Sequence, residues 1–488
     1  MSNTTLLLLL LLLPFLGALA IIAVGKFPNL RESVTLGTAA LVAILVVITA
    51  TRFLGGETFA LTVSEPIPGI TIAFKIEALG MLFALVAGLL WVVTSIYSIG
   101  YMRSLKEQNQ TRFFASFAVA ISCVMGVAFA ENLFTLFLFY ELLTLSTYPL
   151  VAHSGTAEAK KGARTYLLIL LGTSIGLFLL GILVTWFVAG TITFQQGGIL
   201  EGKIDPAWAG LLYALFLFGI GKAAVMPFHR WLPAAMVAPT PVSALLHAVA
   251  VVKAGVFSLL KVTIYIFGSD FILRNDVTGV LIWVAAATIL LASLIAMNKD
   301  NLKARLAYST VSQLSYIVLG TMLASKSGLI GASMHIAMHA FGKITLFFAA
   351  GAIYVVTSKK LISELNGLGR AMPVTFGAFL IGAISIIGLP PLGGMWSKWY
   401  LGLGAVETGH LLLLGVLMLS SLLNITYLLP IPLRAFFSKP ANGEHYTGIK
   451  EAPKTILVAM IITSLTCVLL FFYPDPFYQL AVLAAGGQ

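Results

Sequence analysis

The feature that most constrains this chain is a series of apolar runs, each long enough to cross a bilayer as a helix. Backbone groups in hydrocarbon must be hydrogen-bonded within the protein, so such runs fold as helices. Only 10% of the 488 residues are charged, against about 25% in soluble proteins. We therefore expect an all-α polytopic membrane protein. Fourteen runs lie near 5–24, 34–52, 77–98, 113–130, 133–152, 166–189, 208–226, 242–267, 277–297, 302–323, 328–357, 373–396, 404–433 and 455–473.

The first run, "TTLLLLLLLLPFLGALA", has an alternative interpretation as a cleaved signal peptide that ends in small residues. A signal peptide carries its positive charges before the apolar stretch. Here residues 1–5 hold no Lys or Arg, whereas Lys26 and Arg31 follow the run. This charge order favours a first spanning helix whose N-terminus lies outside.

Loop charges indicate the orientation of the chain. If every second loop faces the cytoplasm, nineteen Lys and Arg residues lie on that side and five on the other. Short cytoplasmic loops are enriched in Lys and Arg, so this distribution supports fourteen spans. It predicts a multi-pass protein of a prokaryotic cell membrane with both termini outside.

Buried charges give the first functional indication. A charged side chain at the centre of a membrane helix costs about 2.5–3.5 kcal/mol on insertion scales and usually marks a functional position. Glu141 is the one carboxylate deep in an expected span, and we expect it to pair with Lys222. Hydrocarbon disfavours the charged form of a lysine, so some of these amines should exchange protons. The basic residues within the expected spans are Lys222, Lys253, Lys261, Lys343 and Lys398.

The stretch "MHIAMHAFGK" places His335, His339 and Lys343 at four-residue intervals, on one face of a helix. With bridging waters, this face would form a lateral proton wire between the Lys222 side and the Lys398 side. A histidine pair at this spacing also occurs in zinc sites, but no carboxylate follows within reach. We therefore expect no metal here, and we add His247 as a supporting relay residue near Lys253.

Two expected spans are interrupted by proline. They read "GIGKAAVMPFHRWLP" and "SIIGLPPLGGMWSKWY", and proline breaks a helix whose freed backbone must then line a cavity or pack against protein. Paired broken helices at matching positions of two halves predict an inverted repeat. We expect one transmembrane domain over 1–488, made of helices one to three (1–112), a first five-helix repeat (113–267), an inverted second repeat (277–433) and a C-terminal helix (455–473).

Five stretches of the chain combine polar, charged and proline residues with apolar ones in a distinctive way. They are "FYELLTLSTYPL", "GKAAVMPFHRWLPAAMVAPTPVSALLHAVAVVKAG", "NLKARLAYSTVSQLSYIVLG", "HIAMHAFGKITLFFAAG" and "GLPPLGGMWSKW". These motifs resemble those of a known family. The chain from about 75 to 435 is similar to the antiporter-like subunits of respiratory complex I, of Mrp-type Na+/H+ antiporters and of membrane-bound hydrogenases. Chain length makes it most similar to the D-type Mrp subunit, although "GMWSKW" departs from the more usual pattern after the double proline.

The resemblance implies fourteen helices with two inverted five-helix repeats, of which the seventh and twelfth helices are broken. It places the ionisable chain of the family on Glu141, Lys222, Lys253 and Lys398. It also matches the helix of His335, His339 and Lys343 to the bridge between two half-channels.

The leading hypothesis is a proton-translocating subunit of a multisubunit membrane complex, which moves H+ and, as an open alternative, Na+. A second hypothesis is a catalytic subunit that binds quinone or NADH, but no dinucleotide motif, iron–sulfur cysteines or soluble domain supports a catalytic centre or cofactor. A third is a self-sufficient transporter. The net charge of +11 is not clustered on a soluble face, so we expect no nucleic acid. Roles stay open for Lys261, His229 and the polar stripe Tyr308, Ser309, Ser312, Gln313 and Ser315.

Overall fold

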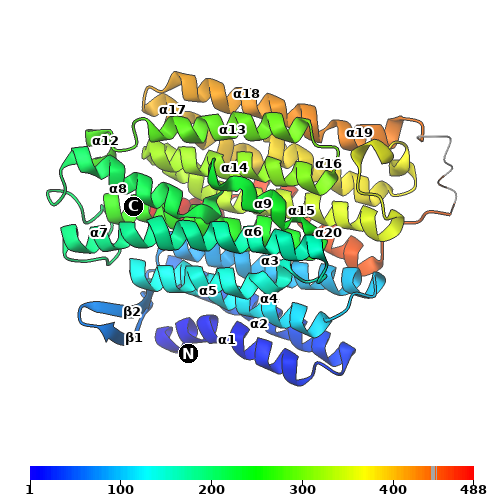
Figure 1. Cartoon of the computed structure of the whole chain (residues 1–488), viewed down its shortest axis with the longest axis horizontal. Coiled ribbons are helices and arrows are strands. Elements are labelled where there is room, and N and C mark those ends of the chain that lie inside the picture. The colour runs from blue at the N-terminus through cyan, green and yellow to red at the C-terminus, as the bar shows by residue number, and fades with distance from the viewer. Residues whose placement is uncertain (441–445, 447, 488) are drawn as a thin grey trace.

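The computed structural model of the chain describes residues 1–440, 446 and 448–487, with the backbone alone for His247. The fold is a bundle of helices that run roughly along one common direction (Figure 1). One two-stranded antiparallel hairpin lies at one end of the bundle, and both termini lie toward that same end (Figure 1). The helical character agrees with the expected all-α membrane protein.

The N-terminal part holds three helices and the hairpin, which the sequence analysis did not anticipate. Strand β1 pairs with β2 in a register that joins Ala60 to Lys75 and Ile67 to Ile70. A Pro-Gly turn between two stretches rich in β-branched residues was the available signal. The elements are α1 Asn3–Ala23, α2 Pro28–Leu54, β1 Ala60–Ile67, β2 Ile70–Lys75 and α3 Ala78–Ser104.

The next part contains the first broken segment. Helix α8 ends at Gly219, and the chain passes through three short 3-10 turns and the four-residue helix α9 before the next helix begins at Thr240. The elements are α4 Gln110–Phe129, α5 Leu133–Val151, α6 Ala157–Thr173, η1 Ser174–Phe178, α7 Leu179–Ala189, α8 Pro206–Gly219, η2 Gly221–Ala223, η3 Phe228–Arg230, α9 Trp231–Ala234, η4 Ala235–Val237, α10 Thr240–Ala244, η5 Leu245–Val249, α11 Val251–Val262 and η6 Thr263–Phe267.

The last part contains the second broken segment. Helix α16 ends at Ile387 with Gly388 in the left-handed region, where glycine is the favoured residue, and α17 begins at Gly394. The elements are α12 Ser269–Asn275, α13 Leu281–Met297, α14 Leu302–Leu323, α15 Lys326–Thr357, η7 Ile362–Glu364, η8 Leu368–Arg370, α16 Pro373–Ile387, α17 Gly394–Glu407, α18 Leu411–Leu428, α19 Pro430–Phe437, α20 Lys454–Phe472 and α21 Asp475–Ala484.

Nine helical segments in the described part are long and apolar enough to cross a membrane, or ten if the bent pair Val251–Phe267 and Ser269–Asn275 is one span. The four remaining apolar runs also hold helices. Three of these, α8, α13 and α16, are shorter apolar helices of 10–17 residues. The fourth, α14, has 22 residues but carries the polar stripe, which lowers its hydropathy.

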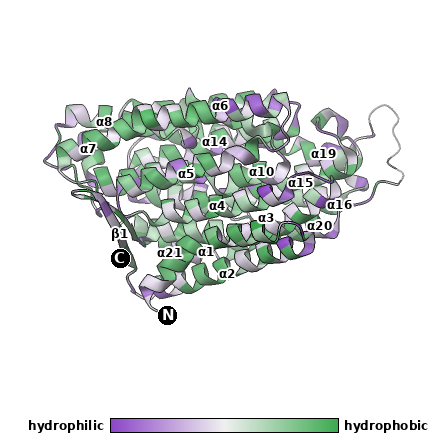
Figure 2. Cartoon of the chain, turned by 60° about the horizontal axis from the view of Figure 1, so that its bottom comes forward, coloured by the Kyte–Doolittle hydropathy of each residue, from purple (hydrophilic) through white to green (hydrophobic). Residues whose placement is uncertain are grey.

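The core of the bundle surrounds α15. Helix α15 has 32 residues and is buried along its length from Gly328 to Ile353. By contrast, α18 leaves Leu412 and Met418 exposed at 74% and 67%. Hydrophobic residues dominate the outer helices along their length (Figure 2). An apolar exterior around a core that holds buried lysines is the arrangement expected of a protein in lipid.

The two ends of the bundle are distinguished by their connections. At the "basic end", formed by the segments 105–109, 152–156, 298–301 and 358–372, Arg112 donates to the His153 carbonyl at 3.1 Å. At the "hairpin end", formed by 60–75, 130–133 and 190–205, the amide of Glu131 bonds the carbonyl of Ala73 at 3.0 Å. Each end is thus closed by contacts between segments distant in sequence.

Candidate functional site

Lys222 lies in the first broken segment, where the helix has ended and the backbone is free to turn its side chain inward. The amine is fully buried and donates to the Tyr140 carbonyl at 2.7 Å and to Thr144 Oγ1 at 2.6 Å. It also lies 3.2 Å from the centre of the Tyr140 ring, a cation–π distance. The break itself is anchored by Trp231, whose indole N–H donates to the carbonyl of Gly221 at 2.9 Å.

Glu141 does not form the ion pair with Lys222 that the sequence suggested. Among the described residues, no carboxylate–amine contact within 4.0 Å joins them, and both oxygens of Glu141 are buried without a hydrogen-bond partner. The amine instead takes the carbonyl of Tyr140, one residue earlier on α5. The first contacts of the amine on α5 are therefore a main-chain carbonyl and a hydroxyl, and not the carboxylate.

Lys253 joins helix α11 to helix α15. It is fully buried, and its amine lies 2.7 Å from Nδ1 of His339. A buried amine next to an imidazole nitrogen is a geometry in which one proton can be shared between two bases. His247 belongs to the π-helical turn η5, and its side chain lies outside the described part of the chain.

His335 joins helix α15 to helix α17. Its Nδ1 lies 2.8 Å from Oγ of Ser397, the residue next to Lys398. The rings of His335 and His339 have centroids 5.7 Å apart, so they are near neighbours without direct bonding. Side chains that meet from α11, α15 and α17 therefore follow one another through the core.

Lys398 lies in the first turns of α17, directly after the second break. Its amine donates to the Ile387 carbonyl at 3.0 Å and to Ser421 Oγ at 3.2 Å. It lies 4.8 Å from the centre of the Tyr316 ring. The partners are again a backbone carbonyl, a hydroxyl and a tyrosine ring, and here the carbonyl belongs to the last residue of α16, at the break.

Lys343 points from α15 toward helix α14 rather than along the histidine contacts. Its amine, fully buried, donates to Ser309 Oγ at 2.8 Å, and the Tyr427 hydroxyl donates to the same oxygen at 3.1 Å. Tyr427 in turn bonds Asn424. The three groups of the "MHIAMHAFGK" face thus contact three different helices.

The polar stripe of α14 divides into two kinds of residue. Ser309 binds Lys343, and Ser312 Oγ bonds Ser293 and the Ile289 carbonyl, which is ordinary helix–helix bonding. Other buried polar atoms around α14 and α15 have no hydrogen-bond partner among the described residues, a condition that usually calls for ordered water. They are Nε2 and Oε1 of Gln313, Oγ of Ser315, Oγ of Ser333 and Nε2 of His335.

Two residues with open roles lie at the ends of the bundle. Lys261 is fully buried and forms an ion pair of 3.1 Å with Glu77, while donating to the Ala130 carbonyl at 2.5 Å. It therefore ties α11 to the hairpin end instead of reaching toward solvent. His229 lies in η3 with its ring 6.1 Å from that of Tyr308.

Sequence reasoning missed the neutral partners of the buried amines. Tyr140 and Thr144 lie about eighty positions from Lys222, and Ser309 lies 34 from Lys343. Their signal was polar residues spaced by four within an apolar run, as in Tyr140 and Thr144. In the described part of the chain, no group of three or more His, Cys, Asp or Glu side chains is placed to hold a metal ion.

Comparison with protein families gives two matches. The family described as "NADH:quinone oxidoreductase/Mrp antiporter, TM" matches residues 130–424, which include all the buried amines above. The family described as "NADH-Ubiquinone oxidoreductase (complex I), chain 5 N-terminus" matches residues 68–114. The first match spans more than half of the chain.

Individual proteins show the same likeness. The "NADH-quinone oxidoreductase subunit N" of Desulforudis audaxviator is 32% identical over 465 residues, covering 92% of this chain and 91% of that protein. A Na(+)/H(+) antiporter protein of Alkalihalophilus pseudofirmus is 30% identical over 442 residues, covering 84% of this chain and 53% of that protein. The chain thus spans about half the length of several longer curated relatives.

A solved structure shows the same fold. A chain in the structure of the Mrp complex from Dietzia sp. superposes with a TM-score of 0.88 at 23% identity, covering 100% of this chain and 97% of that one.

Proposed function

Because this chain belongs to the family of NADH:quinone oxidoreductase and Mrp antiporter transmembrane subunits, we propose that it is a proton-translocating subunit of a multisubunit membrane complex. Glu141, Lys222, Lys253, Lys343 and Lys398 are the relay, supported by His247, His335 and His339. The relay can move protons because burial disfavours the charged form of an amine and so makes it easier for the amine to release its proton.

The observation that carries this proposal is the series of contacts across the middle of the bundle. Lys253 contacts His339, His335 is the next titratable group along α15, and Ser397 connects it to the residue beside Lys398. The series runs from α11, whose Gly255 packs against Lys222 and Ala223 of the first broken segment, to the second broken segment. Broken segments are the places where a membrane protein exposes backbone to a cavity. If these contacts only held the helices together, neutral polar side chains would serve as well as Lys253, His339 and His335.

Water completes the path in the proposal. The unpartnered atoms of Gln313, Ser315 and Ser333 lie on α14 and α15, between Lys343 and the Lys398 side. A bridging water needs two to four polar partners, which these side chains provide. Such waters would carry protons between groups that do not touch.

The proposed architecture has fourteen spans. The four helices α8, α13, α14 and α16 add to the ten candidate spans. We assign 1–112 to helices one to three, 113–267 and 277–433 to two inverted five-helix repeats, and 455–473 to the last span. Both termini lie outside and the basic end faces the cytoplasm of a prokaryotic cell, as the Lys and Arg distribution predicts.

The proposed assembly is an Mrp-type monovalent cation/H+ antiporter, in which this chain is the D-type subunit, with other membrane subunits as its partners. The sequence motifs and the fold shared with the Mrp complex support it. The second candidate is a proton-pumping subunit of an NADH-quinone oxidoreductase, which the 32% identity over 91% of a subunit N favours. A self-sufficient transporter is the third, and the chain purified alone should then exchange Na+ for H+ in liposomes.

Lys343→Ala tests the proposal. Lys343 is an ionisable residue in the middle of α15. A water molecule in its place would not bind the transported proton as the amine does. We expect H+ transport to fall about tenfold or more, with assembly retained, because removal of a buried charge relieves its desolvation cost. Formation of a pH gradient and the amount of assembled complex are measured in the same membrane vesicles. Normal transport, or loss of the complex, would show that the face of α15 is a structural seam.

A further inference from the structure

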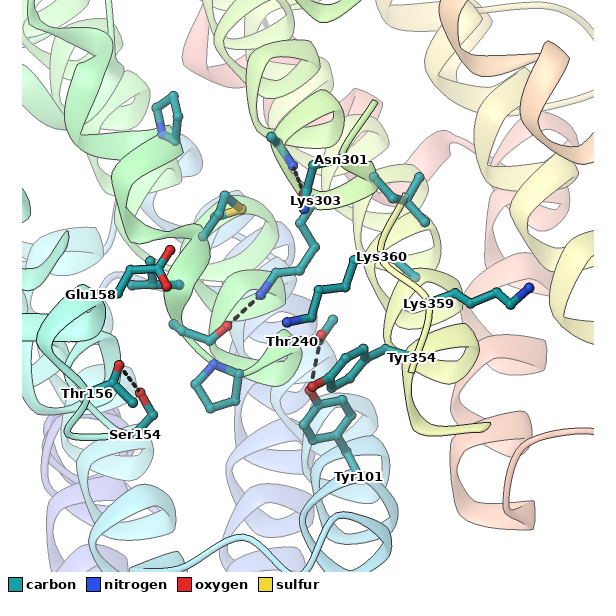
Figure 3. Close-up of a pocket in the computed structure, with 18 of the residues that line it drawn as sticks. Tyr101, Ser154, Thr156, Glu158, Thr240, Asn301, Lys303, Tyr354, Lys359 and Lys360 are labelled. Atoms are coloured by element: carbon teal, nitrogen blue, oxygen red, sulfur yellow. Dashed lines mark hydrogen bonds between the residues drawn. The ribbon is translucent and has the colours of Figure 1, made fainter. Parts of the chain in front are cut away.

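A cavity of about 420 Å3 opens at the basic end and is not part of the relay. Its walls come from the ends of α3 and α15, the start of α14, the segment before α10 and the α5–α6 connection (Figure 3). None of the relay residues named above lines it. The volume is within the range of small-molecule sites, about 300–1,000 Å3.

Backbone pairing fixes two lysines on one wall of this cavity. The amide of Leu302 donates to the carbonyl of Lys360 at 3.0 Å, and Asn301 pairs with Leu361 in an antiparallel bridge. These bonds tie the first turn of α14 to the segment after α15. Lys303 and Lys360 are therefore held as neighbours by the main chain, before any ligand binds.

The amines of both lysines end in the same part of the cavity. Figure 3 shows Lys303 and Lys360 directed toward the space beside Thr240. Lys303 Nζ donates to the Ala238 carbonyl at 2.5 Å, and Lys360 Nζ lies 5.2 Å from the centre of the Tyr354 ring. A carbonyl and a ring orient the amines without bringing a negatively charged group to them.

Neither amine has a carboxylate partner. In the part of the chain that the structure describes, no ion pair includes Lys303 or Lys360. The two acidic residues that line the cavity, Glu107 and Glu158, belong to other walls. Glu158 is exposed, and Glu107 Oε2 lies 3.8 Å from His153 Nε2. Two neighbouring like charges repel in a partly desolvated site, and an anion between them would remove that repulsion.

Neutral donors face the same space. The Tyr101 hydroxyl accepts from Thr240 at 3.4 Å and keeps its own hydrogen for a ligand. Asn301 uses its side-chain oxygen to cap Ala304 at 3.0 Å, which leaves its NH2 group as a donor. Ammonium groups combined with hydroxyl and amide donors match the oxygens of a phosphate.

We propose that this cavity binds a phosphate group, with Lys303 and Lys360 as the charged ligands and Tyr101 and Asn301 as neutral donors. The group belongs to free phosphate or to the headgroup of an anionic phospholipid, and the chemistry of recognition is the same for both. The site does not depend on the proton relay, so its test is independent of the proposed function.

The first arm of the test uses inorganic phosphate. The full chain, with any subunits that copurify, is held in neutral detergent, and its thermal unfolding midpoint is followed as phosphate replaces chloride at constant ionic strength. A ligand that binds the folded state raises the midpoint in a saturable way. Lys303→Gln and Lys360→Gln should each weaken the apparent Kd about tenfold or more, the loss expected for a hydrogen bond to a charged group.

Lys359→Gln is the matched control. Lys359 is adjacent in sequence and has the same charge, but Figure 3 shows its amine directed away from Lys303, and it lies 5.0 Å from the Tyr446 ring. This variant should keep the wild-type dependence on phosphate. If one cavity variant fails to fold, the other still tests the site.

The second arm uses nanodiscs of phosphatidylcholine with or without phosphatidylglycerol. A shift with phosphate that both cavity variants lose supports the site with a free anion as ligand. A shift confined to phosphatidylglycerol and lost in both variants supports it with a headgroup as ligand. No shift in either arm, or equal shifts in the wild type and both cavity variants, would overturn the proposal.

Discussion

Lys222 and Lys398, beside the two broken segments, have neighbours of the same three kinds. Each amine donates to a backbone carbonyl and to a hydroxyl and lies over a tyrosine ring. The distance to the ring centre is 3.2 Å for Lys222 and 4.8 Å for Lys398, and the hydroxyl distances are 2.6 and 3.2 Å. The first amine is therefore held more tightly than the second.

The two sites differ most in charge and in access. Glu141 lies on α5, the helix that accepts the hydrogen bonds of Lys222, one residue after Tyr140. Among the described residues, no carboxylate contacts Lys398. Lys222 is fully buried, but Lys398 borders an apolar pocket of about 410 Å3 between α16, α17 and α18. The same three kinds of neutral group thus surround an amine beside a helix that carries a carboxylate at the first break, and an amine in a more open position at the second break.

The largest expected difference comes from placing a carboxylate at each lysine. Lys222→Glu sets a second acid near Glu141, and like charges in a buried site suppress ionisation of one of them. Lys398→Glu meets no such neighbour and can still titrate. We expect Lys222→Glu to reduce H+ transport about a hundredfold and Lys398→Glu to keep a measurable fraction. Equal activities in vesicle assays would show that Glu141 does not distinguish the two sites.

Glu141→Gln should have the next largest effect. The change keeps the shape of the side chain and removes its charge, so Lys222 loses its one nearby acid. We expect transport to fall about tenfold or more while the complex still assembles. Lys398→Ala provides the counterpart in the second half, and it should stop net transport if Lys398 is the terminal group there. Wild-type rates from Glu141→Gln would remove this residue from the relay.

The hydroxyl partners should give the smallest effects. Thr144→Val and Ser421→Ala each remove one hydrogen bond to a buried amine, and a bond to a charged group is worth about 1.5–3 kcal/mol. The hydrogen bond that Lys222 donates to Thr144 is 0.6 Å shorter than the one that Lys398 donates to Ser421. Loss of the Thr144 hydroxyl should therefore shift the pH dependence of transport more than loss of the Ser421 hydroxyl. Initial rates measured from pH 6 to 9 compare the two variants. A larger change from Ser421→Ala would contradict this order.

The buried amines and the helix breaks could be predicted from the sequence, because a lysine in hydrocarbon and a proline within a helix both cost free energy. Lysines in apolar runs are expensive, and the prolines of both interrupted runs break helices where the structure has breaks. The four-residue spacing in "MHIAMHAFGK" placed His335, His339 and Lys343 on one helix, α15, as expected. Which neighbours these groups contact depends on packing between distant segments, so the sequence could not assign α11, α14 and α17 to them.

The predicted ion pair between Glu141 and Lys222 was wrong because other groups on α5 contact the amine of Lys222. Opposite charges suggested an ion pair, but the amine of Lys222 reaches the main chain of α5 one residue earlier, together with Thr144. The role of Lys261 stayed open because its partner Glu77 is the first residue of the expected span 77–98 and caps the start of α3, so it does not count as a carboxylate deep in a span. A prediction that looks only for opposite charges within the expected spans does not find partners of this kind, which are main-chain carbonyls and residues at helix starts.

Lys253→Met gives the most direct test of the central claim, that the two halves exchange protons through the core. The amine of Lys253 contacts His339 at 2.7 Å and joins α11 to α15, and Met fills a similar space without a titratable group. Lys261→Arg, on the same helix, is the control that keeps the ion pair with Glu77. In vesicles with equal amounts of assembled complex, we predict that Lys253→Met loses about 99% of H+ transport and Lys261→Arg keeps it. Transport by Lys253→Met within twofold of the wild type would contradict the account.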